Sequence, residues 1–170
     1  MINKSNNCHS EYNTENIFSL GPSLLKYLKN KALNSNLKRY RYCLHHSNKH
    51  LTQEMIIVFH RDTIITPHRH PIGRSESYHI IEGSMNVYFF DDNGKVIRGI
   101  KLGEQKKNNF FYYRLSSHTW HLPVSTSEFM IYHETVTGPF IDESDIEYPL
   151  WTKKYDSGEK IKNLINSYKM

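Results

Sequence analysis

The sequence predicts a single all-β domain, a sandwich or a barrel, with a short helix on either side. From residue 53 onward, short apolar runs with period-2 elements alternate with turn signals, which is typical of sandwiches and barrels. The chain has 170 residues, of which 38% are hydrophobic and 13% aromatic. This length suits one domain, and the aromatic content excludes a wholly disordered chain.

The two ends of the chain are expected to lie outside this domain. Residues 1–15 are polar and lack an apolar period, so we expect a flexible tail there. The domain should cover residues 16–151 and begin with a helix at about 22–34, where Pro22 suits the first helical position. Residues 152–170 form a C-terminal tail, in which apolar residues at helical spacing predict a short helix: Ile161, Leu164 and Ile165.

Turn residues separate the runs that we interpret as strands. The strongest turn signal is Asp91-Asp92-Asn93-Gly94, because Asn-Gly tolerates the positive φ angles of a tight hairpin. We therefore expect a hairpin at this point of the chain. The runs themselves comprise residues 55–59, 78–81, 85–90, 110–115 and 129–136.

Charge and composition limit the partners of the protein. Lys and Arg total 22 against 17 Asp and Glu, a net charge of +5. The basic residues are scattered, so no nucleic-acid partner is predicted, whereas an anionic small substrate agrees with the charge. No apolar run approaches the ~18 residues of a membrane span, and the first twenty residues lack a secretory signal. With only Cys8 and Cys43, no disulfide framework is expected, which favours a cytoplasmic location.

The sharpest local feature lies among the 11 histidines of the chain. His68 and His70 flank one residue, and on a strand such a pair projects to the same face. Glu76 starts the next apolar run and offers a carboxylate, and His121 offers a third imidazole. Three imidazoles and one carboxylate form a mixed nitrogen and oxygen site for a divalent ion such as zinc, iron, manganese or nickel. Such a site leaves coordination positions open for water or substrate.

The order His-x-His, Glu, Gly83 and a distant His resembles the two sequence motifs of the cupin superfamily. More specifically, several segments look like the WbuC family of cupin-fold metalloproteins, and the resemblance covers roughly residues 22–151. It implies a six-to-eight-stranded cupin barrel (double-stranded β-helix or jelly roll) with His68, His70, Glu76 and His121 around a metal. The segments that carry it are His68 to Pro71, Ser75 to Gly83, Phe90 to Val96, Thr119 to His121, Glu134, Gly138 to Phe140 and, before the barrel, Arg41 to Ser47.

The sequence departs from the general cupin pattern at several positions. The spacer between His70 and Glu76 is five residues, one longer than that pattern. Asp62 stands where the first motif usually has Gly, and the turn before His121 also differs. There, Ser116 and His118 occupy the usual Pro and Gly positions of the second motif.

Several further residues are candidates for the site. Glu134 matches the family position and is a candidate for a general base or for a hydrogen-bond partner of a metal ligand. It alternates with His133, and parity leaves open which of the two points inward. Tyr78 shares a face with Glu76, whereas His79 should face outward. Three arginines are candidates for binding an anionic group: Arg41, Arg74 and Arg114. By contrast, Arg69 should form a structural ion pair, and His118 should belong to a turn. The remaining histidines are expected in loops or on the surface: His9, His45, His46, His50 and His60.

The resemblance to the WbuC family implies a role in bacterial surface polysaccharide (O-antigen type) biosynthesis. The substrate would be a sugar derivative, changed by metal-assisted isomerisation or epimerisation, with Glu134 or Tyr78 moving the proton. An iron-dependent dioxygenase with the same ligands is the alternative, and a non-enzymatic small-ligand binding or sensor protein is the second. We expect a homodimer, because cupin barrels commonly pair and the helix near 22–34 needs a surface to cover.

Overall fold

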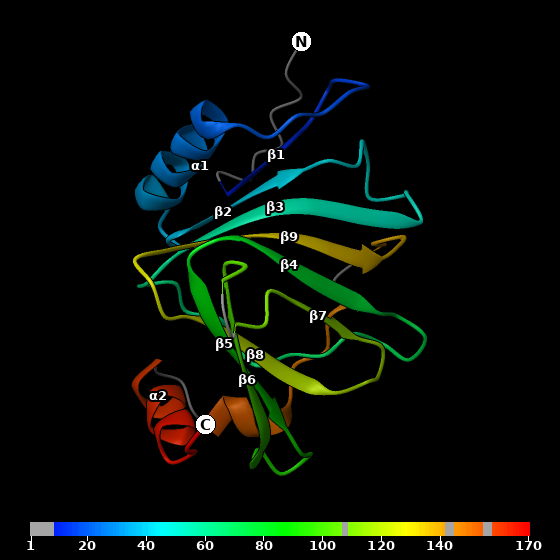
Figure 1. The fold of residues 1–170 in the computed structure, drawn as a ribbon. Helices are drawn as coiled ribbons and strands as arrows, with labels where there is room; N and C mark the ends of the chain where they lie inside the picture. The colour runs from blue at the N-terminus through cyan, green and yellow to red at the C-terminus, as the bar shows by residue number, and fades with distance from the viewer. Residues whose placement is uncertain (1–8, 107–108, 142–144, 155–157) are drawn as a thin grey trace.

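The computed structural model describes residues 9–106, 109–141, 145–154 and 158–170. In these ranges nine strands, two α-helices and one 3-10 helix follow one another along the chain (Figure 1). They are β1 (Ser10–Tyr12), α1 (Pro22–Asn34), β2 (Arg39–Cys43), β3 (Thr52–His60), β4 (Glu76–Glu82), β5 (Ser84–Phe90), β6 (Val96–Gly103), β7 (Tyr112–Leu115), β8 (Trp120–Ser125), β9 (Phe129–Thr137), η2 (Leu150–Lys154) and α2 (Gly158–Asn166).

The strands form two sheets that pack face to face. The larger sheet has the order β1-β2-β3-β9-β4-β7, and the smaller has the order β6-β5-β8. Along β4 the side chains alternate: Glu76, Tyr78 and Ile80 are buried, whereas His79 is exposed, as the sequence predicts. Side chains from both sheets form the central core, which contains Ile57, Phe59, Tyr78, Ile80, Met85, Val87, Phe89, Leu102, Met130 and Tyr132.

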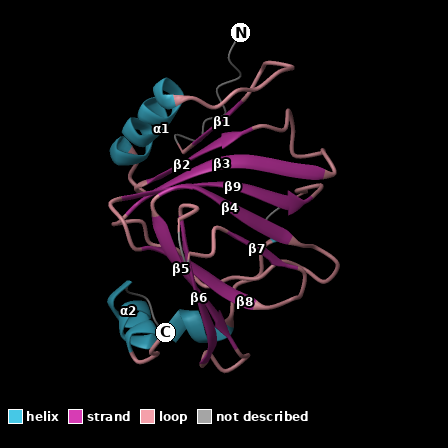
Figure 2. Cartoon of the chain, in the orientation of Figure 1, coloured by secondary structure: helices cyan, strands magenta, loops and turns pink. Residues whose placement is uncertain are grey.

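Each helix covers the outer face of one sheet (Figures 1 and 2). Helix α1 begins at Pro22, as predicted, and buries Leu28 and Ala32 completely. Both side chains pack with residues of the larger sheet that point away from the central core, including Tyr40 and Val58. Helix α2 likewise packs Ile161 and Ile165 against Trp151 and against residues of the smaller sheet. The sheet residues are Tyr88, Phe90, Val96, Trp120 and Leu122. Both predicted helices are present.

The predicted hairpin joins β5 and β6. Asp91 Oδ1 accepts hydrogen bonds from the backbone N–H groups of Asn93 and Lys95, each at 2.9 Å. Gly94 has a φ of +84°, and a Cβ atom at this position would lie 2.7 Å from the Trp151 ring. Only glycine meets both conditions without strain, which explains the glycine at position 94.

The N-terminal tail is shorter than the sequence predicts. Residues 1–8 lie outside the described residues, but Ser10–Tyr12 forms β1, which pairs in parallel with β2 from Arg41 to Cys43. The backbone N–H of Arg41 donates to the carbonyl of His9 at 3.0 Å. A polar segment therefore gains a place at the sheet edge through backbone hydrogen bonds, which leave no apolar period in the sequence.

No helix in the described ranges has the length and apolarity that crossing a membrane requires.

Candidate metal centre

Three histidines from two distant segments meet at one end of the barrel. His68 pairs with His121 of β8 through two backbone hydrogen bonds, of 3.1 Å from His68 N–H and 2.8 Å from His121 N–H. His70 follows on the same side, and one ring nitrogen from each of the three residues lies within 4.8 Å of the other two. The turn before β8 has Ser116 and His118 where the cupin motif usually has Pro and Gly, but this does not displace His121, because β8 is held in register with β5.

The ring orientation of each histidine is fixed from behind. Nδ1 of His68 contacts the carbonyl oxygen of Thr66 at 3.0 Å, and Nδ1 of His121 contacts that of Thr119 at 3.1 Å. Nδ1 of His70 lies 3.3 Å from the carbonyl of Asp145. A carbonyl only accepts, so Nδ1 carries the hydrogen in each ring, and Nε2 is the nitrogen that can bind a metal ion once it carries no proton. This is the arrangement in which histidines bind metal ions.

Glu76 projects from β4 into the same cluster. Its carboxylate oxygens lie 3.2 Å from Nε2 of His70 and 3.1 Å from Nε2 of His121. Two tyrosine hydroxyls hold the carboxylate from the core side, Tyr113 at 2.6 Å and Tyr78 at 3.2 Å. His121 Nε2 is fully buried, and its contact with Glu76 lacks the geometry of a hydrogen bond. A buried ring nitrogen without a hydrogen-bond partner is suited to binding a metal ion.

The local charges favour a neutral His68 beside an anionic Glu76. Loss of solvent and the neighbouring His121 lower the pKa of His68 to about 3, so this ring is neutral at physiological pH. Burial alone would raise the pKa of Glu76, but the adjacent His121 and His70 outweigh it and hold that pKa well below its usual value. Burial also lowers the pKa of His70, yet contact with Glu76 outweighs burial and raises it. Three imidazoles and one carboxylate could therefore hold a divalent ion.

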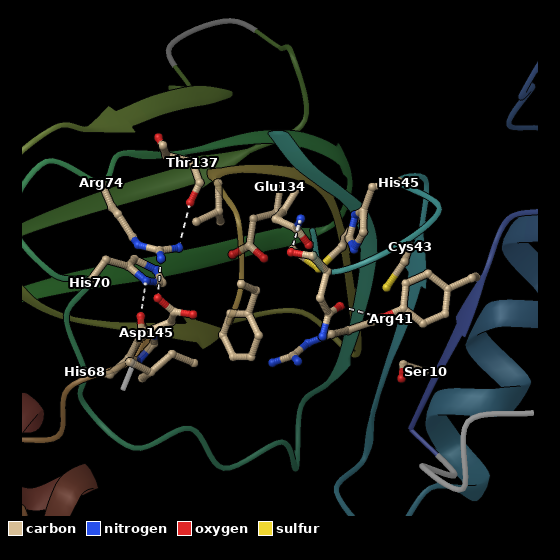
Figure 3. Close-up of a pocket in the computed structure, with 17 residues that line it drawn as sticks. Ser10, Arg41, Cys43, His45, His68, His70, Arg74, Glu134, Thr137 and Asp145 are labelled. Carbon is tan, nitrogen blue, oxygen red and sulfur yellow. Dashed lines mark hydrogen bonds and ion pairs between the residues drawn. The ribbon is translucent and has the colours of Figure 1, made fainter. Parts of the chain in front are cut away.

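A cavity of about 240 Å³ opens beside the imidazole cluster and is shown in Figure 3. Glu134 of β9 lines it together with His68 and His70, which answers the question that parity left open. His133 faces the other way and lies 3.6 Å from Glu54. Burial and the charge of nearby Glu76 raise the pKa of Glu134 to about 7.

The other candidate residues divide into cavity and structural positions. Arg41 and Arg74 line the cavity, but Arg74 is already paired with Asp145 and donates to a backbone carbonyl at 3.0 Å. Arg114 is exposed and donates to Ser75 Oγ at 3.1 Å, so it lies outside this cavity. Tyr78 is buried in the core and reaches the site through its hydroxyl.

The carboxylate of Glu147 contacts two side chains, those of Arg69 and His118, behind the imidazole cluster. Arg69 points away from the cavity, with Nε 2.8 Å from Glu147, and its guanidinium stacks over Trp120. This confirms the predicted structural ion pair. His118 is more than a turn residue, because its Nε2 lies 3.0 Å from the same carboxylate.

His45 is a cavity residue that the sequence did not identify. It was expected in a loop or on the surface, but it is 6% exposed and lines the cavity. Burial lowers the pKa of His45 and keeps the ring neutral. The only signal was its position in the segment that resembles the family, since a histidine between two strands has no periodicity to reveal burial.

Comparisons with known proteins agree with this architecture. A family model described as a domain of unknown function (DUF6016) matches residues 20–102, which include His68, His70 and Glu76 but not His121. No match is found among curated proteins. Solved structures with the same fold exist for proteins of low sequence identity.

Three of these structures cover most of the chain. An uncharacterized conserved protein with a double-stranded β-helix domain from Klebsiella pneumoniae is 18% identical, with a TM-score of 0.52 over 80% of this chain and 93% of that one. A hypothetical protein from Leishmania major is 12% identical, with a TM-score of 0.55 over 75% and 87%. A Shewanella oneidensis protein is 13% identical, with a TM-score of 0.53 over 75% and 80%. The fold is the all-β cupin fold, the double-stranded β-helix.

Proposed function

We propose that this protein is a metal-binding cupin that acts on a small polar molecule. The ligands are the four residues that resemble the cupin motifs: His68, His70, Glu76 and His121. The observation that carries the proposal is the common direction of the three imidazoles. Each has its Nδ1 on a backbone carbonyl, and one ring nitrogen of each lies within 4.8 Å of the others.

A bound divalent ion would supply Lewis acidity, polarising a carbonyl or hydroxyl oxygen of the substrate. The chain supplies the remaining functions. Glu134 lines the cavity and has a pKa of about 7, raised by burial and Glu76. A group with that pKa can take a proton from a substrate carbon and return it at the same or a neighbouring carbon. We therefore propose isomerisation or epimerisation, with Glu134 as the residue that moves the proton.

The proposed role of Tyr78 is to orient the carboxylate ligand. Burial and Glu76 raise the pKa of Tyr78 well above its usual value, so its hydroxyl stays protonated. A protonated hydroxyl donates to Glu76 and cannot serve as a base at neutral pH. Such contacts behind a ligand commonly strengthen metal binding.

The proposed substrate is a sugar derivative in bacterial surface polysaccharide (O-antigen type) biosynthesis. This part of the proposal rests on the resemblance to the WbuC family, and the size and mixed polar lining of the cavity agree with such a molecule. We further propose a homodimer, which sedimentation of the purified protein would test. A monomer at micromolar concentration would contradict it.

Elemental analysis of protein purified without chelator tests the metal centre directly. We expect about one divalent ion per chain in the wild type and a loss of most of it in His68→Ala and His70→Ala. His79→Ala is the matched control, because His79 is an exposed histidine on the outer face of β4. A wild type that retains no more metal than His68→Ala would refute the metal centre.

Oxygen consumption separates the proposed reaction from the dioxygenase alternative. An isomerase converts its substrate without using oxygen, whereas a dioxygenase with the same ligands consumes oxygen only when substrate is added. Iron content together with substrate-dependent oxygen uptake would therefore replace the isomerase proposal.

A further inference from the structure

Arg41 differs from the other arginine that lines the cavity. Arg74 is neutralised by Asp145. In the part of the chain that the structure describes, the guanidinium of Arg41 has no carboxylate within ion-pair distance and no hydrogen-bond partner. It nevertheless lies in the wall of the same cavity as His68 and His70. A positive charge that is partly withdrawn from water and left unpaired is costly unless an anion arrives to meet it.

The register of β2 aims this charge inward. Tyr40 packs beneath α1 on the outer face, so its neighbours Arg39 and Arg41 lie on the opposite face. Figure 3 shows Arg41 reaching toward the middle of the cavity, with His68 and His70 across from it. Burial and the adjacent Arg41 lower the pKa of Arg39, which reflects two positive charges held close together.

His45 adds a neutral donor to this end of the cavity. Nδ1 of His45 lies 3.0 Å from the carbonyl oxygen of Glu54 and 3.1 Å from the backbone N–H of the same residue. The carbonyl already accepts from Leu44 N–H at 2.7 Å, so the N–H is the group that depends on His45. A backbone N–H inside a strand needs an acceptor, so Nδ1 of His45 is unprotonated and Nε2 carries the hydrogen. His45 lines the cavity.

We propose that the cavity binds a small anion whose carboxylate or phosphate group is held by Arg41, with the N–H of His45 as a second donor. Guanidinium suits this role because its fork of donors matches both groups bidentately. The orientation of the ligand, with its uncharged end at the imidazole cluster, rests on the proposed function. The anion subsite itself does not, because Arg41 and His45 belong to β2 and the segment after it.

The position of Glu134 agrees with such a ligand. In Figure 3 it lies between the Arg41 end and the His70 end of the cavity. Burial and Glu76 raise its pKa, and the charges of Arg41 and His70 partly oppose that rise. It is thus within electrostatic reach of both ends. A substrate bound at Arg41 that extends to the imidazole cluster would therefore lie beside the carboxyl group of Glu134.

Isothermal titration calorimetry on chelator-treated protein tests the subsite without any metal. The probes are glucuronate, glucose 6-phosphate, inorganic phosphate and neutral glucose. We expect at least one of the sugar anions to bind at least about tenfold more tightly than glucose, since charge-assisted hydrogen bonds are roughly twice as strong as neutral ones. Which sugar anion binds more tightly then distinguishes carboxylate from phosphate.

Variants assign that preference to Arg41. Arg41→Gln should weaken binding of the preferred anion at least about tenfold, and Arg41→Lys should fall between, because it keeps the charge but loses the fork. Arg98→Gln, at an exposed arginine on β6, is the matched control and should bind as the wild type does. Thermal unfolding midpoints verify that the variants are folded.

Two outcomes would overturn the proposal. One is a wild type that binds no anion more tightly than glucose, a result that needs no variant. The other is a folded Arg41→Gln protein that keeps the wild-type affinity. Failure of the metal centre gives a different pattern, in which metal content is absent while anion binding to the chelator-treated protein still depends on Arg41.

Discussion

Glu134→Gln removes one ionisable group from the wall of the cavity and should make the stability of the protein less sensitive to pH. Burial and the charge of Glu76 raise the pKa of Glu134 from 4.5 to about 7 in the folded chain. The folded state therefore holds this proton more tightly than the unfolded state. The stabilisation that the proton gives is complete below about pH 4.5 and is lost as pH rises through 7.

The two pKa values set the size of the effect. A single group with this shift makes the wild type lose about 2.5 kcal/mol of unfolding free energy between pH 5 and pH 8, relative to a variant whose side chain stays neutral. Urea unfolding of both proteins at pH 5 and pH 8, with chelator present, measures it. Glu128→Gln, at an exposed glutamate, controls for the loss of one carboxylate. Parallel pH profiles for wild type and Glu134→Gln would refute the assignment of a raised pKa to this residue.

Three further predictions concern the same barrel. Burial raises the pKa of the Cys43 thiol to about 11, so its alkylation at pH 8, followed by peptide mass, should be about 100-fold slower than that of a thiol with pKa 9. A rate typical of an exposed thiol would contradict the burial. Gly83→Ala should lower the free energy of unfolding by roughly 2 kcal/mol or more, because φ is +81° and the new Cβ would lie 2.1 Å from a backbone carbonyl of β9. Gly73→Ala, with φ +89° but open space around it, should cost only about 1 kcal/mol, and equal losses in urea unfolding would argue against the clash. Tyr113→Phe removes the 2.6 Å hydrogen bond to the carboxylate of the candidate metal centre and should weaken metal binding about tenfold in a competition titration. Tyr112→Phe, at the exposed neighbour, should have no effect, and an unchanged affinity in Tyr113→Phe would remove the proposed support of the carboxylate.

Local signals predicted the parts of the fold that local physics determines. The helix from Pro22 to Asn34 follows from apolar spacing and a proline at the first turn, and the hairpin at Gly94 follows from turn chemistry. Alternation along β4 correctly separated buried Glu76 from exposed His79. In each case the information lies within a few residues of the feature.

The remaining features depend on contacts between distant segments. Strands β2, β6 and β8 were not among the predicted runs, because they carry arginines, lysine or proline between their apolar residues. The burial of His45 and the pairing of Arg74 with Asp145 depend on segments that are distant in the sequence and meet only in the folded chain. The three histidines were predicted to meet from motif order, but the backbone hydrogen bonds between His68 and His121 of β8 fix how they meet.

Backbone hydrogen bonds behind the histidines also hold the segment that carries His68 and His70. His68 exchanges two hydrogen bonds with His121, and the next residue, Arg69, exchanges two with Glu147. The segment with two of the ligands is therefore held on both sides by main-chain hydrogen bonds. Amide hydrogens at these positions should exchange with solvent together, as one cooperative unit. Because these main-chain hydrogen bonds do not involve the imidazoles, replacing a histidine side chain should leave the slow exchange of these amide hydrogens unchanged.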